Sequence, residues 1–121
     1  MTKLTGPKKI DTAVFISGKG TNLSSLIKFS LKKRSPIIIK VVVSNKSKAK
    51  GLNFAKKHKI KVNIFKFNLK DDQKILNFLS KNQIKLICLA GFMKILSKNF
   101  INKFNGIILN IHPSLLPKYK G

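Results

Sequence analysis

The chain has 121 residues, 43% of them hydrophobic, and a mass of 13.6 kDa, which predicts one folded domain and argues against a disordered tail. Its 26 Lys and Arg residues face 3 Asp and Glu residues, so the net charge is +23 and the surface attracts anions. No apolar run approaches about 18 residues, which excludes a membrane-spanning helix. Cys88, the one cysteine, lies in a short apolar run, and we therefore expect a buried thiol and a cytoplasmic protein.

The lysine excess has two possible origins. It could be a nucleic-acid surface, or it could reflect a genome-wide preference for Lys, Ile and Asn codons. The lysines are scattered along the chain beside 16 Ile and 11 Asn, with one Arg, one Tyr and no Trp. Because nucleic-acid proteins favour Arg and stacking aromatic residues, codon preference is favoured and we do not expect nucleic acid as the main partner. A basic, non-catalytic domain that binds nucleotides or nucleic acid stays open as an alternative.

Strand-like and helical segments alternate along the chain. In chain order, we expect strands at Thr12–Ser17, Ile37–Ser44, Lys61–Phe65, Lys85–Ala90 and Gly106–Ile111. Between them we expect four helices. The first is capped by Thr21 or Asn22 and has Leu23, Leu26, Ile27 and Leu31 on one face; the others run from Leu52 to His58, after Asp71 and Asp72, and, for a shorter one, behind Ser97. This alternation predicts an α/β fold with a mostly parallel sheet and helices on both faces. Ligands of such sheets bind beyond the carboxyl ends of the strands.

A glycine-containing turn follows the first expected strand. Gly18 and Gly20 flank this turn, and Thr21 and Asn22 open the helix behind it. Free amides at a helix start, with glycines that let a ligand approach, predict a phosphate site. The alternative is a tight turn that needs glycine for its backbone alone.

Asn110 lies near the end of the last expected strand, and His112 lies two residues further along the chain, directly after that strand. Side chains at this spacing point the same way, so both would enter one pocket. A histidine there can move protons near neutral pH, and an amide can donate to a developing oxyanion. The alternative for His112 is a structural, hydrogen-bonded role, and His58 is interpreted as a solvated residue at a helix end. With no metal-ligand spacing, carboxylate pair or paired nucleophile in the sequence, these groups fit acyl-type transfer to an amine.

Four segments together resemble the phosphoribosylglycinamide formyltransferases, the folate-dependent enzymes of purine synthesis. The segments are Ser17–Leu23, Val43–Lys46, Leu89–Ser97 and Leu109–Gly121. The resemblance implies a Rossmann-like formyltransferase fold and a monomer or homodimer without metal. The implied reaction moves a formyl group from 10-formyltetrahydrofolate, the co-substrate, to the amine of glycinamide ribonucleotide. Formyltetrahydrofolate deformylase and methionyl-tRNA formyltransferase are the near alternatives, although His112-Pro113 fits the purine enzyme better.

The resemblance also implies roles for individual residues. The ribonucleotide phosphate would be held by Gly20, Thr21 and Asn22, and the folate pocket would be lined by Met93, Lys94, Ile95 and Leu96. Asn110 would contact the folate and steady the formyl oxygen, and His112 would transfer protons. Lys66 and Lys70 are both candidates for the basic residue that contacts folate before the third helix.

The sequence departs from the family pattern after the Ser-Leu-Leu-Pro loop at Ser114–Pro117. The resemblance implies an aspartate beyond this loop that orients His112 and raises its pKa. Nine residues follow His112, and none is acidic. We therefore expect residues 1–121 to be a single amino-terminal formyltransferase domain, truncated after that loop, with the carboxyl-terminal strands missing and little activity.

Overall fold

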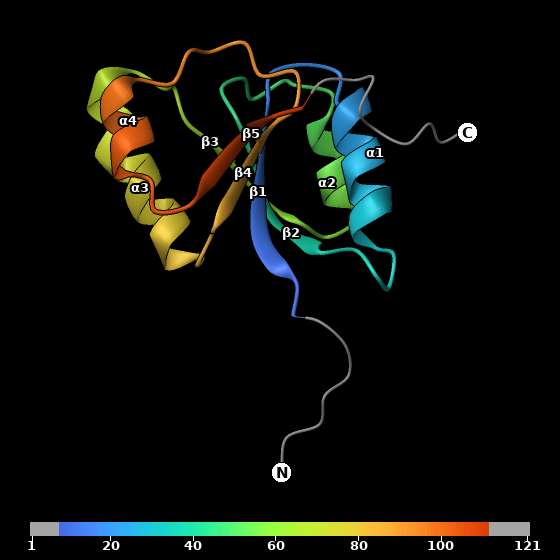
Figure 1. Cartoon of the computed structure of the whole chain (residues 1–121). Helices are drawn as coiled ribbons and strands as arrows, with labels where there is room; N and C mark the ends of the chain where they lie inside the picture. The colour runs from blue at the N-terminus through green and yellow to red at the C-terminus, as the bar shows by residue number, and fades with distance from the viewer. Residues whose placement is uncertain (1–7, 112–121) are drawn as a thin grey trace.

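A computed structural model describes residues 8–111, and the structural statements below concern these residues (Figure 1). The strands are β1 (Ile10–Ile16), β2 (Ile37–Ser44), β3 (Lys61–Ile64), β4 (Leu86–Leu89) and β5 (Ile107–Asn110). The helices are α1 (Thr21–Ser30), α2 (Leu52–Lys57), α3 (Asp72–Lys81) and α4 (Lys98–Lys103), and a short 3-10 helix, η1 (Leu69–Asp71), precedes α3. The predicted alternation of strands and helices is confirmed, with boundaries that differ by one or two residues.

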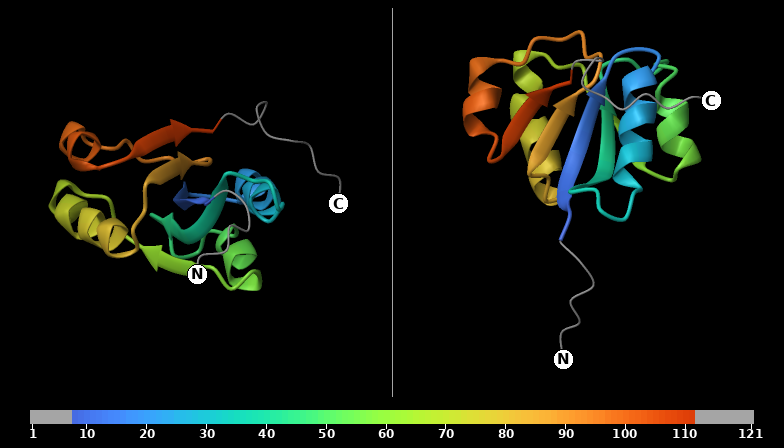
Figure 2. Two further views of the ribbon diagram at one scale, coloured as in Figure 1. Left: turned by 60° about the horizontal axis from the view of Figure 1, so that its bottom comes forward. Right: turned by 45° about the vertical axis from the view of Figure 1, so that its right-hand side comes forward.

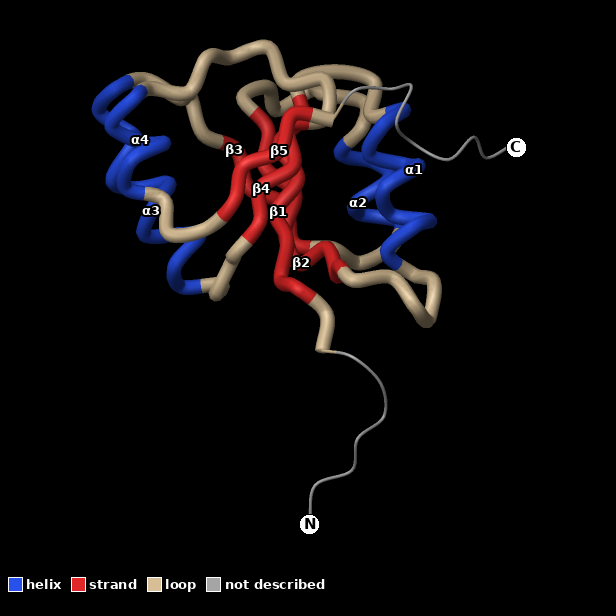
Figure 3. The backbone as a smooth tube through the Cα atoms, viewed as in Figure 1, coloured by secondary structure: helices blue, strands red, loops and turns tan. Residues whose placement is uncertain are grey.

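The five strands form one sheet in the order β3-β2-β1-β4-β5, and every described pair is parallel. The chain winds outward from β1 to β3, then returns to place β4 on the other side of β1. The direction of winding therefore reverses between β1 and β4, which is where parallel sheets of this kind bind ligands. The loops that follow the strands gather at one end of the sheet, at the top of Figures 1 and 3.

Helices cover both faces of the sheet, as the sequence predicts (Figure 2). On one face, α1 and α2 bury Leu23, Ile27 and Leu52 against Val14 and Ile16 of β1. On the other face, α3 and α4 bury a second apolar cluster, made by Ala13, Phe15, Ile75, Leu79, Phe100 and Phe104 with their neighbours. Successive residues of β1 thus face opposite clusters, which explains why the central strand is a continuous apolar run.

Two local expectations are wrong. Leu31 is 66% exposed, because it follows the last residue of α1 as the C-cap and leaves the buried face where the helix ends. Thr21 and Asn22 do not cap α1 with their side chains; the N-cap is Gly20, in the left-handed conformation. The start of α3 at Asp72 agrees with the expectation, and its charge suits the amino end of a helix.

β5 is an edge strand with incomplete cover. Ile108 packs against the cluster under α3 and α4, but Ile107 is 61% and Leu109 46% exposed. An apolar edge of this kind is a site for association with further polypeptide. None of the helices formed by residues 8–111 is long and apolar enough to cross a membrane.

Candidate functional site

The turn after β1 presents the amino end of α1. Gly20 adopts φ +81 and ψ 24, and its carbonyl accepts the first helical hydrogen bond from Ser24 N at 2.8 Å. No side chain caps this end. The first amides of α1, at Thr21 and Asn22, therefore remain available to an anion, and the helix dipole adds positive potential there.

Gly20 is also required by packing against α2. A Cβ atom at Gly20 would lie 2.4 Å from the Cα of Gly51, which no fold could accept without a backbone shift. Gly51 N in turn donates to Gly18 O at 3.0 Å, so the two helix starts meet backbone to backbone. The backbone explanation of Gly20 is thus confirmed, and it is compatible with a phosphate site formed by the amides beyond it.

The loop after β4 carries the four residues that the resemblance implies for folate. Met93 and Ile95 are 77% and 95% exposed, Lys94 is exposed, and Leu96 packs against the cluster under α3 and α4. Large apolar side chains held in water are costly unless something covers them. The loop therefore offers an apolar surface to a ligand or to further polypeptide.

An aromatic cluster anchors the start of this loop. Gly91 turns the chain with φ +67, and Phe92 then inserts its ring 5.4 Å from Phe15 and 4.8 Å from Phe67, both edge to face. These centroid distances lie within the favourable range for aromatic pairs. Phe92 is therefore a structural anchor and points away from the exposed part of the loop.

A buried carboxylate anchors the other end. Asp72 accepts hydrogen bonds from Ser97 Oγ at 2.6 Å and from Asn99 Nδ2 at 3.3 Å, while Ser97 Oγ accepts from Phe100 N at 3.0 Å as the cap of α4. Asp72 is 9% exposed, so these bonds compensate part of its desolvation. Sequence reasoning placed the fourth helix behind Ser97 but missed the link from Ser97 to Asp72, because 25 residues separate the two.

Asn110 ends β5, where its backbone lies beside Leu89 of β4. It is exposed, and the next residue, Ile111, donates its amide to Leu89 O at 2.9 Å. The register thus places Asn110 next to the start of the β4–α4 loop. His112 lies outside the described residues, so its pairing with Asn110 remains a prediction. Lys66 and Lys70 are both exposed, so their exposure does not distinguish them.

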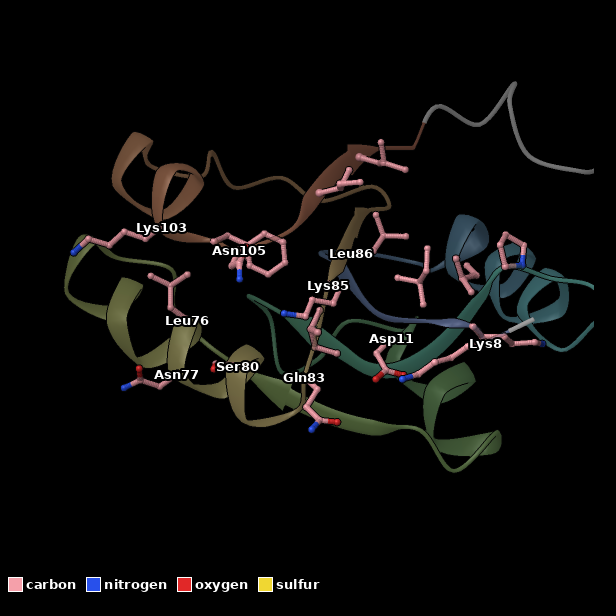
Figure 4. A pocket seen from close by; sticks show the side chains of 18 of the residues that line it. Lys8, Asp11, Leu76, Asn77, Ser80, Gln83, Lys85, Leu86, Lys103 and Asn105 are labelled. Carbon is pink, nitrogen blue, oxygen red and sulfur yellow. The ribbon is translucent and has the colours of Figure 1, made fainter. Parts of the chain in front are cut away.

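A large cavity lies at the other end of the sheet. It has a volume of about 1340 Å³ and is lined by Lys85, Leu86, Lys103 and the exposed Ile107 and Leu109, among others (Figure 4). Its lining comes from the amino ends of β1, β2 and β4, from β5, and from residues of α3 that include Leu76 and Ser80. It contains none of the predicted phosphate and folate residues. We assign it to the uncovered edge of the sheet.

No group of three or more His, Cys, Asp or Glu residues in the described part of the chain could hold a metal ion. Cys88 is buried in β4, and burial raises the pKa of its thiol to about 11. It is therefore protonated near neutral pH and behaves as a small core residue, as the sequence predicts.

Comparison with known proteins decides the family. The family model for formyl transferase matches residues 10–121 of the chain. The chain belongs to the formyl transferase family. Its five-stranded parallel sheet with helices matches the fold of solved formyltransferase structures, and the fold prediction is confirmed.

Named relatives narrow the family further. The chain is 47% identical over 119 residues to the phosphoribosylglycinamide formyltransferase of Haemophilus influenzae, covering 94% of this chain and 55% of the relative. It is 43% identical over 119 residues to the human trifunctional purine biosynthetic protein adenosine-3, covering 94% of this chain and 12% of that protein. The crystal structure of the Brucella melitensis phosphoribosylglycinamide formyltransferase matches with a TM-score of 0.78 and 39% identity, over 94% of this chain and 62% of that one.

These matches confirm the resemblance to phosphoribosylglycinamide formyltransferases. They also show that this formyl transferase chain spans about half the length of its bacterial relative, 55%, and a smaller share of the trifunctional protein.

Proposed function

We propose that this formyl transferase chain forms the ribonucleotide- and folate-binding part of an enzyme that formylates glycinamide ribonucleotide. The proposal is carried by one observation: the two surfaces that could bind ligands lie within the part of the chain that matches phosphoribosylglycinamide formyltransferases. The open amino end of α1 and the exposed β4–α4 loop both lie at the carboxyl end of the sheet, within the segment that matches phosphoribosylglycinamide formyltransferases.

The α1 turn is the proposed phosphate site. The ribonucleotide phosphate accepts hydrogen bonds from the amides of Thr21 and Asn22, and the absence of a side-chain cap leaves these donors free. Exposed Lys19 stands in the same turn and adds positive charge. Gly20 lets the chain turn sharply enough to aim the amides outward.

The β4–α4 loop is the proposed folate site. Met93 and Ile95 offer apolar contact to the pterin ring, and the backbone of Lys94 offers polar groups. The two ends of the loop are fixed by Phe92 and by Ser97, which restricts the exposed residues between them before the folate arrives.

Formyl transfer then requires one bond to form and one to break. The ribonucleotide amine attacks the formyl carbon, the new carbon–nitrogen bond forms, and the bond between that carbon and N10 of the folate breaks. The amine loses a proton and N10 gains one, for which we propose His112 as the carrier. The Asn110 amide donates to the oxygen that becomes negative in the intermediate.

We further propose that a carboxylate outside residues 1–121 favours the protonated state of His112. A cytoplasmic enzyme, acting as a monomer or homodimer without metal, is part of the same proposal. The net charge of +23 favours one competing function, a basic domain that binds polyanions without catalysis.

Equilibrium binding separates the two functions. We expect glycinamide ribonucleotide to bind the protein far more tightly than ribose 5-phosphate does, and to keep most of its affinity as salt increases. Equal affinity for RNA and heparin, which falls steeply with salt, would contradict the enzyme proposal and support the basic domain.

A charge variant tests the phosphate site itself. Thr21→Glu places a carboxylate beside the proposed phosphate at an exposed position, while Thr21→Gln keeps the size without the charge. We expect at least about 10-fold weaker ribonucleotide binding for the glutamate and near-normal binding for the glutamine, since like charges repel at short range. Equal binding by both variants would exclude the α1 turn as the phosphate site.

A further inference from the structure

One buried hydroxyl lies between the proposed ligand loops. Ser17, directly after β1, is 3% exposed. Its Oγ accepts a hydrogen bond from Met93 N at 2.8 Å and donates to Asn45 Oδ1 at 2.6 Å. The hydroxyl thus connects the loops that follow β1, β4 and β2, which meet where the winding of the sheet reverses.

The direction of each bond follows from the groups involved. Met93 N–H can only donate, so Ser17 Oγ accepts there and its own proton is free to go to Asn45. Asn45, with its carbonyl oxygen engaged, keeps its amide nitrogen as a donor at the carboxyl end of β2. A hydroxyl is the smallest side-chain group that can make both bonds at once.

The contact with Met93 fixes the middle of the β4–α4 loop. Phe92 and Ser97 hold the loop ends, and Leu96 packs against the cluster under α3 and α4. The hydrogen bond from Met93 N to Ser17 Oγ ties this loop to the turn after β1. Met93, whose amide makes this bond, and Ile95, two residues further on, carry the exposed apolar side chains of the loop. Loss of this bond would leave them free to move away from the α1 turn.

Group transfer makes the distance between the two loops important. The amine and the formyl carbon have to approach to about 3–3.5 Å with correct alignment, and a small displacement of either ligand lowers the rate. Ser17 is covalently continuous with the Gly18–Gly20 turn and hydrogen-bonded to the β4–α4 loop. The same residue therefore sets the position of both proposed binding elements relative to each other.

We propose that Ser17 is a positioning residue that holds the β4–α4 loop in register with the α1 turn. It touches neither ligand, and acts through Met93 on one side and Asn45 on the other. The inference rests on the proposed function, because it presupposes that folate binds the β4–α4 loop and the ribonucleotide binds the α1 turn.

The test uses the 121-residue protein and the Ser17→Ala variant, with tetrahydrofolate and glycinamide ribonucleotide as separate probes. We expect Ser17→Ala to weaken tetrahydrofolate binding about 10-fold and ribonucleotide binding by less than about 3-fold, since one hydrogen bond to the loop is lost. Ser17→Thr, which keeps the hydroxyl, should restore most of the folate affinity. Ser47→Ala, an exposed serine in the β2–α2 loop, is the matched control and should bind both ligands normally.

Amide hydrogen exchange supplies a readout that needs no ligand. In Ser17→Ala we expect the Met93 amide to exchange at least about 10-fold faster, while the Ala90 amide, bonded to Phe15 O at 2.9 Å, keeps its protection. Asn45→Ala, which removes only the acceptor of the Ser17 proton, should show a smaller change at Met93.

The outcomes separate the two claims. If the wild-type protein binds both ligands and Ser17→Ala binds them equally well, the positioning role is wrong. Equal loss of both ligands, with faster exchange throughout the sheet, would mean that Ser17 merely stabilises the fold and would also overturn it. A wild-type protein that binds neither ligand contradicts the proposed function instead, and Met93 exchange then still reports whether Ser17 holds the loop.

Discussion

Alanine substitutions at four glycines of this chain can distinguish the cost of backbone strain from the cost of steric contact. An alanine at Gly91 would have a positive φ of +67 and open space around its Cβ, whereas one at Gly51 would have an ordinary φ of −59 but meet Ile16 Cδ1 at 2.7 Å and Gly20 Cα at 2.8 Å. Gly20 combines both problems, and Gly18 has neither. Substitution of each by alanine therefore tests the two effects singly and together.

The expected costs follow from general magnitudes. A left-handed conformation costs an L-residue about 1–2 kcal/mol, which is the expected loss for Gly91→Ala. Overpacking costs about 1–3 kcal/mol, which applies to Gly51→Ala. Gly20→Ala should lose about 2–5 kcal/mol, the sum of both, and Gly18→Ala should stay within about 0.5 kcal/mol of the wild type. A domain of 121 residues has roughly 6–18 kcal/mol to lose, so all four variants should fold.

Urea unfolding followed by circular dichroism measures these differences. If Gly20→Ala loses no more stability than Gly18→Ala, the close approach of α1 and α2 is wrong. The contact also bears on Gly20→Val as a test of the phosphate site. With the contact present, that variant disturbs the fold as well as the ligand and does not distinguish the two.

Three further predictions concern other parts of the chain. Ile107→Lys, on the exposed face of edge strand β5, should reduce self-association in sedimentation velocity. Leu69→Lys, at a leucine that is even more exposed but lies away from this edge, should not, and equal effects would contradict the edge as the site of association. Because only the thiolate reacts, native Cys88 should react with a thiol reagent about 100-fold more slowly at pH 8 than an unfolded cysteine does. Its reaction should become faster as the pH rises toward the pKa of about 11, and rapid reaction at pH 8 would contradict its burial. Asp72→Ala leaves Ser97 Oγ without its acceptor and should lower the free energy of unfolding by about 1–3 kcal/mol in urea titration; an unchanged value would mean that the bond between α3 and α4 contributes nothing.

Most of the fold could be predicted because its signals are local. Each strand is a short apolar run, and the winding rules for parallel sheets then place the polar turns at one end. The exposed state of Leu31 could not be predicted, since helical spacing continues one residue beyond the point at which α1 ends. The contact between Gly20 and Gly51 also escaped, because it depends on how two helices pack, which periodicity does not encode.

The sequence indicates which residues form the candidate site, but it does not show the contacts that hold their loops in place. Gly20 and Met93 stand at the carboxyl ends of adjacent strands, as expected, yet the link between their loops passes through Ser17, which the sequence shows only as one polar residue after a strand. Asn45 likewise follows β2 as a polar residue, and its bond to Ser17 spans 28 positions. Contacts between residues so far apart in the sequence can be predicted only once the fold is known.

The central claim is that two ligands bind at the carboxyl ends of β1 and β4. The most direct measurement is a pair of NMR titrations that follow the backbone amides of the uniformly labelled protein. Glycinamide ribonucleotide should shift the amides of Thr21 and Asn22, and tetrahydrofolate should shift those of Met93 and Ile95. Shifts confined to the cavity at the amino ends of the strands, at Lys85 and Lys103, or spread over lysines throughout the chain, would contradict the claim.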